Sequence, residues 1–344
     1  MTPPSTASPT SVPESTWAAA VRVLLDADEV ALAAHLNPDG DSLGSMLGLG
    51  QALASLGKRA LCSWDGNSPL EVPTAYADLP GLDLLVPPSE FPVAPPVLVC
   101  LDTGSPDRLG RFAAAATRAD VVLVIDHHAS NEGFGSVNLI DPHAAATAVL
   151  VEELVRRLGA KLTADVAACL YTGLTTDTGS FKYASTTPAV HELAARLLAT
   201  GIRHDEIARA IWDTNCFAYV SMLGAVLSRA VLEHEAAGGL GLVWTYSTAA
   251  DLSAYGVSIE ELEGVIDMIR TTAEAEVAAV CKQDVDGSLK VSMRSKGRID
   301  VGALCTGLGG GGHRMAAGLT TTGDAETVLP LIRDRLARAP HLIP

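Results

Sequence analysis

The stretch Val121-Val-Leu-Val-Ile-Asp126-His127-His128 decides how this chain folds. Five apolar residues, most of them β-branched, run directly into a carboxylate and two imidazoles. A run of this kind is typical of a buried strand in a parallel sheet. Ligands of open α/β sheets bind at the carboxyl ends of the strands. We therefore expect Asp126, His127 and His128 to take part in chemistry; the alternative is that they cap a neighbouring helix.

Three more predicted elements end in side chains of the same kind. Residues 29–34 and 96–101 read as buried strands, and residues 164–175 read as a helix. The polar residues that follow these elements are His35, Asp39 and Asp41, then Asp102, and then Asp177. Taken singly, each aspartate fits a helix cap equally well. Because the ends of parallel strands share one edge of a sheet, the four segments together predict one site.

The composition of this site predicts two metal ions. Asp39 and Asp41 are two residues apart, a spacing that in extended backbone points both carboxylates the same way. Crowded carboxylates repel one another unless cations lie between them. Two ions roughly 3.5–4 Å apart can activate a bridging water and clamp a phosphoryl group. Imidazole among oxygen ligands favours Mn²⁺ or a similar ion over Mg²⁺. The six candidate ligands are His35, Asp39, Asp41, Asp102, His127 and Asp177.

A glycine-rich segment supplies a candidate anion site. Four consecutive glycines at 309–312 could crowd backbone N–H groups around an anion, although a flexible linker is the alternative. Two cations, Arg294 and Lys296, follow a predicted strand, and an Arg fork suits phosphate. Arg108 could reach a phosphate or be an ordinary surface residue. The candidate substrate-binding residues are Arg108, Arg294, Lys296, Gly310, Gly311, Gly312 and His313.

Composition narrows the class of partner. The formal net charge of -16 should repel long nucleic acid, whose affinity depends on Lys and Arg contacts to phosphate. Aromatic residues make up only 4% of the chain and offer few stacking platforms. The six cysteines form no CxxC pair, which favours buried thiols in a reducing cytoplasm. No signal peptide and no membrane-spanning run is expected.

The pattern of elements predicts an α/β protein with two domains. Residues 1–15 are rich in Pro, Ser and Thr and are expected to be disordered. Residues 16–200 are predicted to form a catalytic domain around a parallel sheet. A helical linker at 201–230 leads to a smaller α/β domain with a mixed sheet at 231–344, which contains a hairpin at Gly287.

These motifs resemble the DHH phosphoesterase superfamily. Asp126-His127-His128 matches the motif that gives the family its name, and the run from Gly309 to His313 matches the GGGGH mark of its DHHA1 domain. The resemblance covers about residue 21 to the end and is closest to the nanoRNase and pAp-phosphatase group. It implies hydrolysis of short oligoribonucleotides, pApA and 3′-phosphoadenosine 5′-phosphate (pAp), with cyclic di-AMP as a further candidate.

The resemblance also implies a role for each residue. One Mn²⁺ would be held by His35, Asp39 and Asp102, and the other by Asp41, Asp102, His127 and Asp177. Asp126 would orient His127, and His128 would help the leaving group. Arg294 and His313 would hold the substrate, assisted by Arg108. Relatives are often dimers, so the Ala- and Leu-rich faces of the linker helices could form a dimer interface or belong to the intramolecular core.

Two departures and three rival functions stay open. Alanines replace serines before Thr147, and Lys182 stands where Arg is frequent; neither position is expected to touch a ligand. An inorganic pyrophosphatase would share the metal cluster but lack the GGGGH loop. A processive exonuclease would be expected to carry a further basic domain. A non-catalytic nucleotide sensor would be expected to have lost ligands, whereas all six are present.

Overall fold

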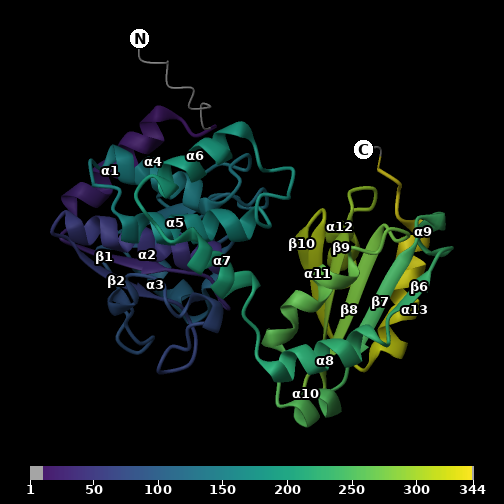
Figure 1. The fold of residues 1–344 in the computed structure, drawn as a ribbon. Helices are drawn as coiled ribbons and strands as arrows, with labels where there is room; N and C mark the ends of the chain where they lie inside the picture. The colour runs from purple at the N-terminus through teal and green to yellow at the C-terminus, as the bar shows by residue number, and fades with distance from the viewer. Residues whose placement is uncertain (1–10, 343–344) are drawn as a thin grey trace. The chain divides into compact units, whose positions relative to one another are not determined.

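The computed structural model describes residues 11–342, which divide into two compact units between Thr214 and Asn215 (Figure 1). The division falls inside the segment predicted as a helical linker. Each unit is an α/β structure with its own sheet and its own hydrophobic core. The predicted α/β class, with a parallel sheet in the first unit and a mixed sheet in the second, is confirmed.

The sheet of the first unit is parallel throughout and has the strand order β2-β1-β3-β4-β5. The chain leaves β1 toward one edge and returns through β3 toward the other, so the strand order reverses between β1 and β3. Such a reversal opens a crevice at the carboxyl ends of the strands. The strands are β1 (Glu29–Ala33), β2 (Arg59–Ser63), β3 (Val97–Leu101), β4 (Val121–Asp126) and β5 (Val137–Ile140).

Helices cover both faces of this sheet. One face packs α1, α2 and α4, with α5 and α6 behind them, and the other packs η3 and α3. The larger helices of this unit are α1 (Glu14–Asp26), α2 (Gly40–Ser55), α4 (Thr147–Arg157), α5 (Ala164–Asp177), α6 (Pro188–Leu198) and α7 (His204–Trp212). Shorter turns are η1 (Thr74–Tyr76), η2 (Leu82–Leu84), η3 (Pro106–Phe112) and α3 (Ala113–Ala116).

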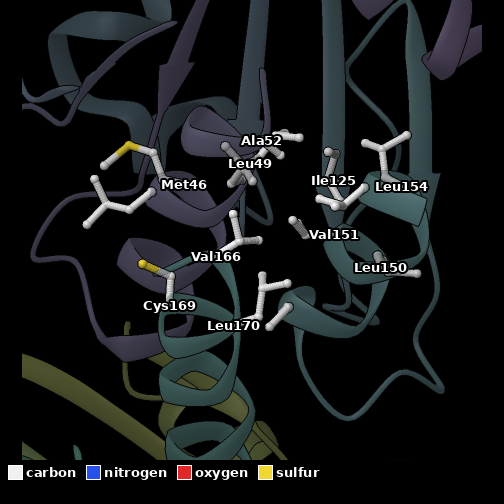
Figure 2. Packing of buried hydrophobic residues seen from close by; sticks show 14 of the residues in the cluster. Met46, Leu49, Ala52, Ile125, Leu150, Val151, Leu154, Val166, Cys169 and Leu170 are labelled. Carbon is white, nitrogen blue, oxygen red and sulfur yellow. The ribbon is translucent and has the colours of Figure 1, made fainter. Parts of the chain in front are cut away.

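Apolar side chains from α2, α4, α5 and the sheet form one continuous core cluster. Figure 2 shows Met46 and Leu49 of α2, Leu150 of α4 and Leu170 of α5, which belong to the same cluster as Ile125 of β4. All five side chains are fully buried. This packing fixes the helices whose first and last turns border the carboxyl ends of the strands.

The sheet of the second unit is mixed, with the order β10-β11-β9-β8-β7-β6. Only β7 and β8 pair in parallel; the other neighbours are antiparallel. The predicted hairpin at Gly287 joins β8 and β9, with φ of 85° at that glycine. The strands are β6 (Val231–Glu233), β7 (Leu242–Ser247), β8 (Val277–Gln283), β9 (Ser288–Ser295), β10 (Gly311–His313) and β11 (Ala316–Thr322).

Two helical layers flank this second sheet. One core cluster packs α9, α12 and α13 on one face, and another packs α8, α10, η4 and α11 on the other. These elements are α8 (Phe217–Leu227), α9 (Ala236–Gly239), α10 (Ala249–Tyr255), η4 (Glu260–Gly264), α11 (Val265–Ile269), α12 (Val301–Thr306) and α13 (Ala325–Arg338).

Several boundaries differ from the prediction. The helical linker predicted at 201–230 contains two separate helices, because α7 ends at Trp212 and α8 begins at Phe217. Residues 11–15, expected to be disordered, are ordered: Ser11 is hydrogen-bonded and α1 begins at Glu14. The rest of the segment predicted as disordered lies outside the described residues.

Within residues 11–342, no single helix is long and apolar enough to cross a membrane, and only α7 and α8 together, as a bent pair, have the necessary length and composition.

Candidate metal centre

Asp102 lies at the centre of a cluster of ligand-type side chains. Its Oδ2 is 3.6 Å from Nε2 of His35, and its Oδ1 is 3.6 Å from Nε2 of His127. These separations exceed the length of a hydrogen bond. Two ligand atoms that each lie roughly 2.1 Å from one ion can stand this far apart. Asp102 is 3% exposed, so its two oxygens face two imidazoles inside the protein and can bridge two ions.

The backbone conformation of Asp102 helps to place it. The residue directly follows β3 and has φ of 54°, the left-handed region that Asp tolerates better than most residues. Its amide donates to the carbonyl of Ile125 on β4 at 2.9 Å. The chain therefore turns sharply at the end of β3, beside the point where the strand order reverses.

Both histidines of the cluster are oriented by backbone carbonyls. Nδ1 of His35 lies 2.7 Å from the carbonyl of Leu36, and Nδ1 of His127 lies 3.2 Å from the carbonyl of Ala144. A ring whose Nδ1–H donates to a carbonyl presents the lone pair of Nε2 on its other side. Histidines that ligate metals are usually held in this way. The orientation of both rings therefore fits metal ligation.

Asp41 reaches the cluster from the first turn of α2 and is fully buried. Its carboxylate accepts hydrogen bonds from the amides of Thr147 (2.6 Å) and Ala148 (2.9 Å), at the N-terminus of α4. The positive end of that helix stabilises the negative charge. A Cβ at Gly173 of α5 would lie only 2.6 Å from Oδ1 of Asp41, so glycine is required for α5 to pass this close.

The spacing argument for Asp39 and Asp41 was wrong. Asp39, the N-cap of α2, is extended and forms a capping box with Ser42, but Gly40 and Asp41 are already helical, so the extended stretch does not reach Asp41. The two carboxylates consequently lie in different surroundings: the Asp39 side chain is 52% exposed, whereas Asp41 is buried. Oδ2 of Asp39 nevertheless lies 3.7 Å from Nε2 of His35. The residue is a helix cap and a candidate ligand at once.

Asp126 contacts different groups from those expected. Its Oδ1 is 2.7 Å from Nδ1 of His128 and accepts the backbone amide of His127 at 2.9 Å. Asn131 donates to its other oxygen at 2.7 Å. The side chain of Asp126 therefore orients the ring of His128, while the ring of His127 is held by Ala144 instead.

Three sets of potential ligand atoms gather in this unit, each within 4.8 Å: His35, Asp39 and Asp102; Asp41, His127 and Asp177; and Asp102, His127 and His128. Asp102 and His127 each belong to two sets. Asp177 is the last residue of α5, and its Oδ2 lies 3.0 Å from Nε2 of His127. The structure thus brings together all six side chains that the sequence nominated as ligands.

Excess negative charge raises the pKa of both imidazoles. Burial lowers the pKa of His35, but the carboxylates of Asp102 and Asp39 outweigh burial and raise it to about 10. Burial also lowers the pKa of His127, and Asp177 is the main group that raises it, again to about 10. The cluster therefore attracts positive charge, which protons or metal ions can supply.

The carboxylates show the same imbalance. Burial, followed by the charges of Asp102 and Asp177, raises the pKa of Asp41 well above its usual value. Burial is also the first cause of the raised pKa of Asp177. Carboxylates crowded in this way share a site stably when cations lie between them. The donor set of imidazole nitrogens and carboxylate oxygens fits divalent ions of the Mn²⁺ type.

The sequence analysis missed the groups that support the candidate ligands. The Thr147 hydroxyl donates to Oδ1 of Asp102 at 3.0 Å, and the Ala144 carbonyl holds His127. The expectation that the alanine segment before Thr147 touches no ligand was therefore wrong. The contact with His127 is made by the backbone carbonyl of Ala144, and a pattern of side chains does not reveal such a contact. The only signal in the sequence was that this segment precedes a predicted helix.

The predicted substrate-binding cations differ in their surroundings. Arg108 is exposed, and its Nη2 lies 3.3 Å from Nδ1 of His35, at the edge of the cluster. Arg294, on β9, is half-buried and donates to the neighbouring carbonyl of Met293. The ammonium of Lys296 donates to the carbonyl of Thr272, so a backbone contact already occupies this cation.

The glycine segment forms a strand rather than the expected loop. Gly311, Gly312 and His313 form β10 and pair with β11. A Cβ at Gly310 would lie 2.2 Å from the carbonyl oxygen of Gly318, and one at Gly312 would lie 2.5 Å from Cα of Ala317. A Cβ at Gly311 would meet no atom within 4 Å. Close packing against β11 therefore requires glycine at positions 310 and 312, whereas Gly311 borders open space.

Comparison with known proteins places the chain in a family. Residues 29–174 match the DHH family, N-terminal domain, and residues 246–338 match the DHHA1 domain. The chain is similar to the bifunctional oligoribonuclease and PAP phosphatase NrnA of Thermus thermophilus, with 34% identity over 91% of this chain and 92% of that protein. The cyclic-di-AMP phosphodiesterase GdpP of Geobacillus thermodenitrificans is 27% identical over 89% of this chain and 47% of that protein.

A solved structure shares the fold. An exopolyphosphatase-related protein from Bacteroides fragilis superposes with a TM-score of 0.86 at 24% identity, covering 95% of this chain and 97% of that one. The resemblance inferred from the Asp126-His127-His128 and glycine motifs is confirmed by these matches. The chain belongs to the DHH/DHHA1 phosphoesterases, a family of hydrolases, in the branch of the bifunctional oligoribonucleases and PAP phosphatases.

Proposed function

We propose that this chain is a Mn²⁺-dependent phosphoesterase that hydrolyses short oligoribonucleotides, pApA and pAp. The observation that carries the proposal is the position of Asp102, whose two oxygens face Nε2 of His35 and Nε2 of His127. The similarity to the oligoribonuclease and PAP phosphatase of Thermus thermophilus supports this class of substrate.

The proposed ligands divide around Asp102. One ion would be held by His35, Asp39 and Asp102, and the other by Asp41, Asp102, His127 and Asp177. Bound divalent ions would lower the pKa of water and offset charge on the phosphoryl group. The chain itself fixes the ligands in advance: backbone carbonyls hold both rings, and the N-terminus of α4 holds Asp41.

His128 is the proposed general acid. Burial lowers its pKa, but the hydrogen bond to Asp126 outweighs burial and the pKa is raised. With Nδ1–H donated to Asp126, a proton on Nε2 can pass to the leaving oxygen as the P–O bond breaks. Asp126 is itself fixed by Asn131, so the ring keeps one orientation.

Candidate substrate contacts are proposed in each unit by itself. Arg108 borders the cluster through its contact with His35 and can contact a phosphate there. Arg294 and His313 are the proposed phosphate and base contacts of the second unit, and Gly311 leaves room for a ligand to approach the backbone. Because the chain carries a formal net charge of -16, a long strand would meet repulsion outside these local cations.

A direct comparison of substrates tests the proposal. The protein is stripped with chelator and repleted with Mn²⁺, and turnover of pAp, pApA, pyrophosphate and a 20-nucleotide RNA is measured. We expect Mn²⁺-dependent turnover of pAp and pApA only. Full activity in excess chelator, or a preference for pyrophosphate or for the 20-nucleotide RNA, would refute it.

Cyclic di-AMP is a second candidate substrate. The specific support is the similarity to the cyclic-di-AMP phosphodiesterase of Geobacillus thermodenitrificans over 89% of this chain. Adding cyclic di-AMP to the same assay and comparing kcat/KM with that for pApA distinguishes the two. A higher value for the cyclic nucleotide would make it the main substrate. The homodimer and the cytoplasmic location stay predictions, which light scattering and cell fractionation can test.

A further inference from the structure

The N-terminal segment is joined to the loop that supports the cluster. Ser11 donates twice to the carboxylate of Asp141: its hydroxyl to Oδ1 at 2.6 Å and its amide to Oδ2 at 3.1 Å. Asp141 follows β5, lies 130 residues further along the chain and is only 4% exposed. Two donors from the tail therefore satisfy a buried carboxylate that would otherwise lack these partners.

Asp141 organises the turn that follows it. Its Oδ1 also accepts the amide of His143 at 3.1 Å, and its carbonyl accepts the amide of Ala144 at 3.0 Å. Its own amide donates to the carbonyl of Asp126 at 3.1 Å, so the turn is tied to the end of β4. An aspartate that binds the amide two residues ahead stabilises a tight turn.

This turn carries three supports of the metal centre. The carbonyl of Ala144 holds the ring of His127. A few residues later, Thr147 donates its amide to Asp41 and its hydroxyl to Asp102. Ser11 is therefore linked to the candidate ligands indirectly: it binds Asp141, and residues 144 and 147 of the turn that Asp141 begins bind His127, Asp41 and Asp102.

We propose that Ser11 is a positioning residue of the metal centre: by holding Asp141, it fixes the turn that orients His127, Asp41 and Asp102. This inference rests on the proposed function, because it assumes that these side chains bind metal. Its consequence is that the N-terminal segment tunes metal affinity although it touches no ligand itself.

The same segment provides a matched control. Glu14, three residues further on, forms a bidentate ion pair with Arg157 of α4, at 2.5 and 2.9 Å. That contact is made at the last residue of α4, the opposite end from Thr147 and Ala148, and it does not involve Asp141. Removing the Glu14 ion pair tests the effect of general packing on metal affinity, whereas removing the Ser11 hydroxyl tests the effect of the contact with Asp141.

The experiment measures Mn²⁺ affinity by isothermal titration calorimetry for the full chain and for Ser11→Ala, Ser11→Thr and Glu14→Gln. We expect Ser11→Ala to bind Mn²⁺ roughly tenfold more weakly, the lower end of the effect of losing an outer hydrogen-bond partner. Ser11→Thr, which keeps the hydroxyl, should restore the affinity, and Glu14→Gln should leave it unchanged. Hydrogen exchange should show faster exchange of amides 143–148 in Ser11→Ala only.

The outcomes separate the two claims. Equal affinities for the full chain and Ser11→Ala would overturn the inference, as would an equal loss of affinity in Ser11→Ala and Glu14→Gln, because general packing would then explain it. If the unaltered chain bound no Mn²⁺ at all, the proposed function would fall instead.

Discussion

The Thr147 hydroxyl donates a 3.0 Å hydrogen bond to Oδ1 of Asp102, the carboxylate that lies between the two imidazoles. The backbone amide of the same threonine donates to Asp41. One residue at the start of α4 thus orients two candidate ligands that come from different segments of the chain. The contributions of its hydroxyl and its backbone amide can be measured separately, because replacing Thr147 by valine removes the hydroxyl and keeps the amide.

Thr147→Val should weaken Mn²⁺ binding. The valine keeps the shape and the amide contact with Asp41 but leaves Asp102 without its hydroxyl donor. We expect a 10- to 100-fold loss of Mn²⁺ affinity, the usual effect of removing such a partner. Calorimetric titration gives the affinity, and Thr147→Ser, which retains the hydroxyl, is the control. An unchanged affinity in Thr147→Val would show that Asp102 does not need this contact.

Stability without metal should fall as the pH rises. The pKa of His35 and that of His127 are raised to about 10 in the fold, compared with about 6.5 in an unfolded chain. A raised imidazole pKa contributes stability that is complete below about pH 6.5 and is lost as the pH rises toward 10. Urea unfolding of chelated protein between pH 6.5 and 9.5 measures this decline.

Metal binding should reverse this pH dependence. His35 and His127 must release their protons to become ligands, so Mn²⁺ affinity should increase with pH and binding should release protons. Calorimetry in buffers with different ionisation enthalpies counts those protons. Binding without proton release would argue that the two imidazoles are not ligands.

Gly173→Ala should destabilise the first unit. The added Cβ would lie 2.6 Å from Oδ1 of Asp41 and 3.0 Å from Cβ of Ala148, so α4 and α5 would have to separate. We expect a loss of about 1–3 kcal/mol, typical of overpacking, measured by chemical denaturation. The control is Gly224→Ala in α8, where nothing lies within 4 Å. Replacing that helical glycine should stabilise its own unit by about 0.5–1 kcal/mol.

Gly310 and Gly311 should respond differently to alanine. A Cβ at Gly310 would lie 2.2 Å from the carbonyl oxygen of Gly318, so this substitution should disrupt the pairing of β10 with β11 and destabilise the second unit. At Gly311 the methyl group meets no protein atom within 4 Å, and the fold should be unaffected. A rise in KM for pApA in Gly311→Ala, with unchanged unfolding, would support a substrate contact there. An unchanged KM would remove Gly311 from the proposed site.

The sequence by itself determined the long buried strands of the first unit that precede the candidate ligands, their parallel arrangement, and the six candidate ligands. Continuous apolar runs such as residues 121–125 are typical of buried parallel strands, and a polar residue directly after such a strand lies at the strand's end. Short or irregular strands were missed because they contain no continuous apolar run. The strand β5 has a single buried residue, Leu139, and β10 is mostly glycine, so neither carries a periodic signal.

Only the tertiary structure decided which groups support the ligands. The carbonyl of Ala144, the amides of Thr147 and Ala148, and the contact of Ser11 with Asp141 all join segments that are far apart in the chain. Every residue except proline has both a backbone N–H donor and a carbonyl acceptor. The residue type therefore does not indicate which backbone group will bind a given side chain. The partner is set by how helices pack on the sheet, and that packing exists only in the folded protein.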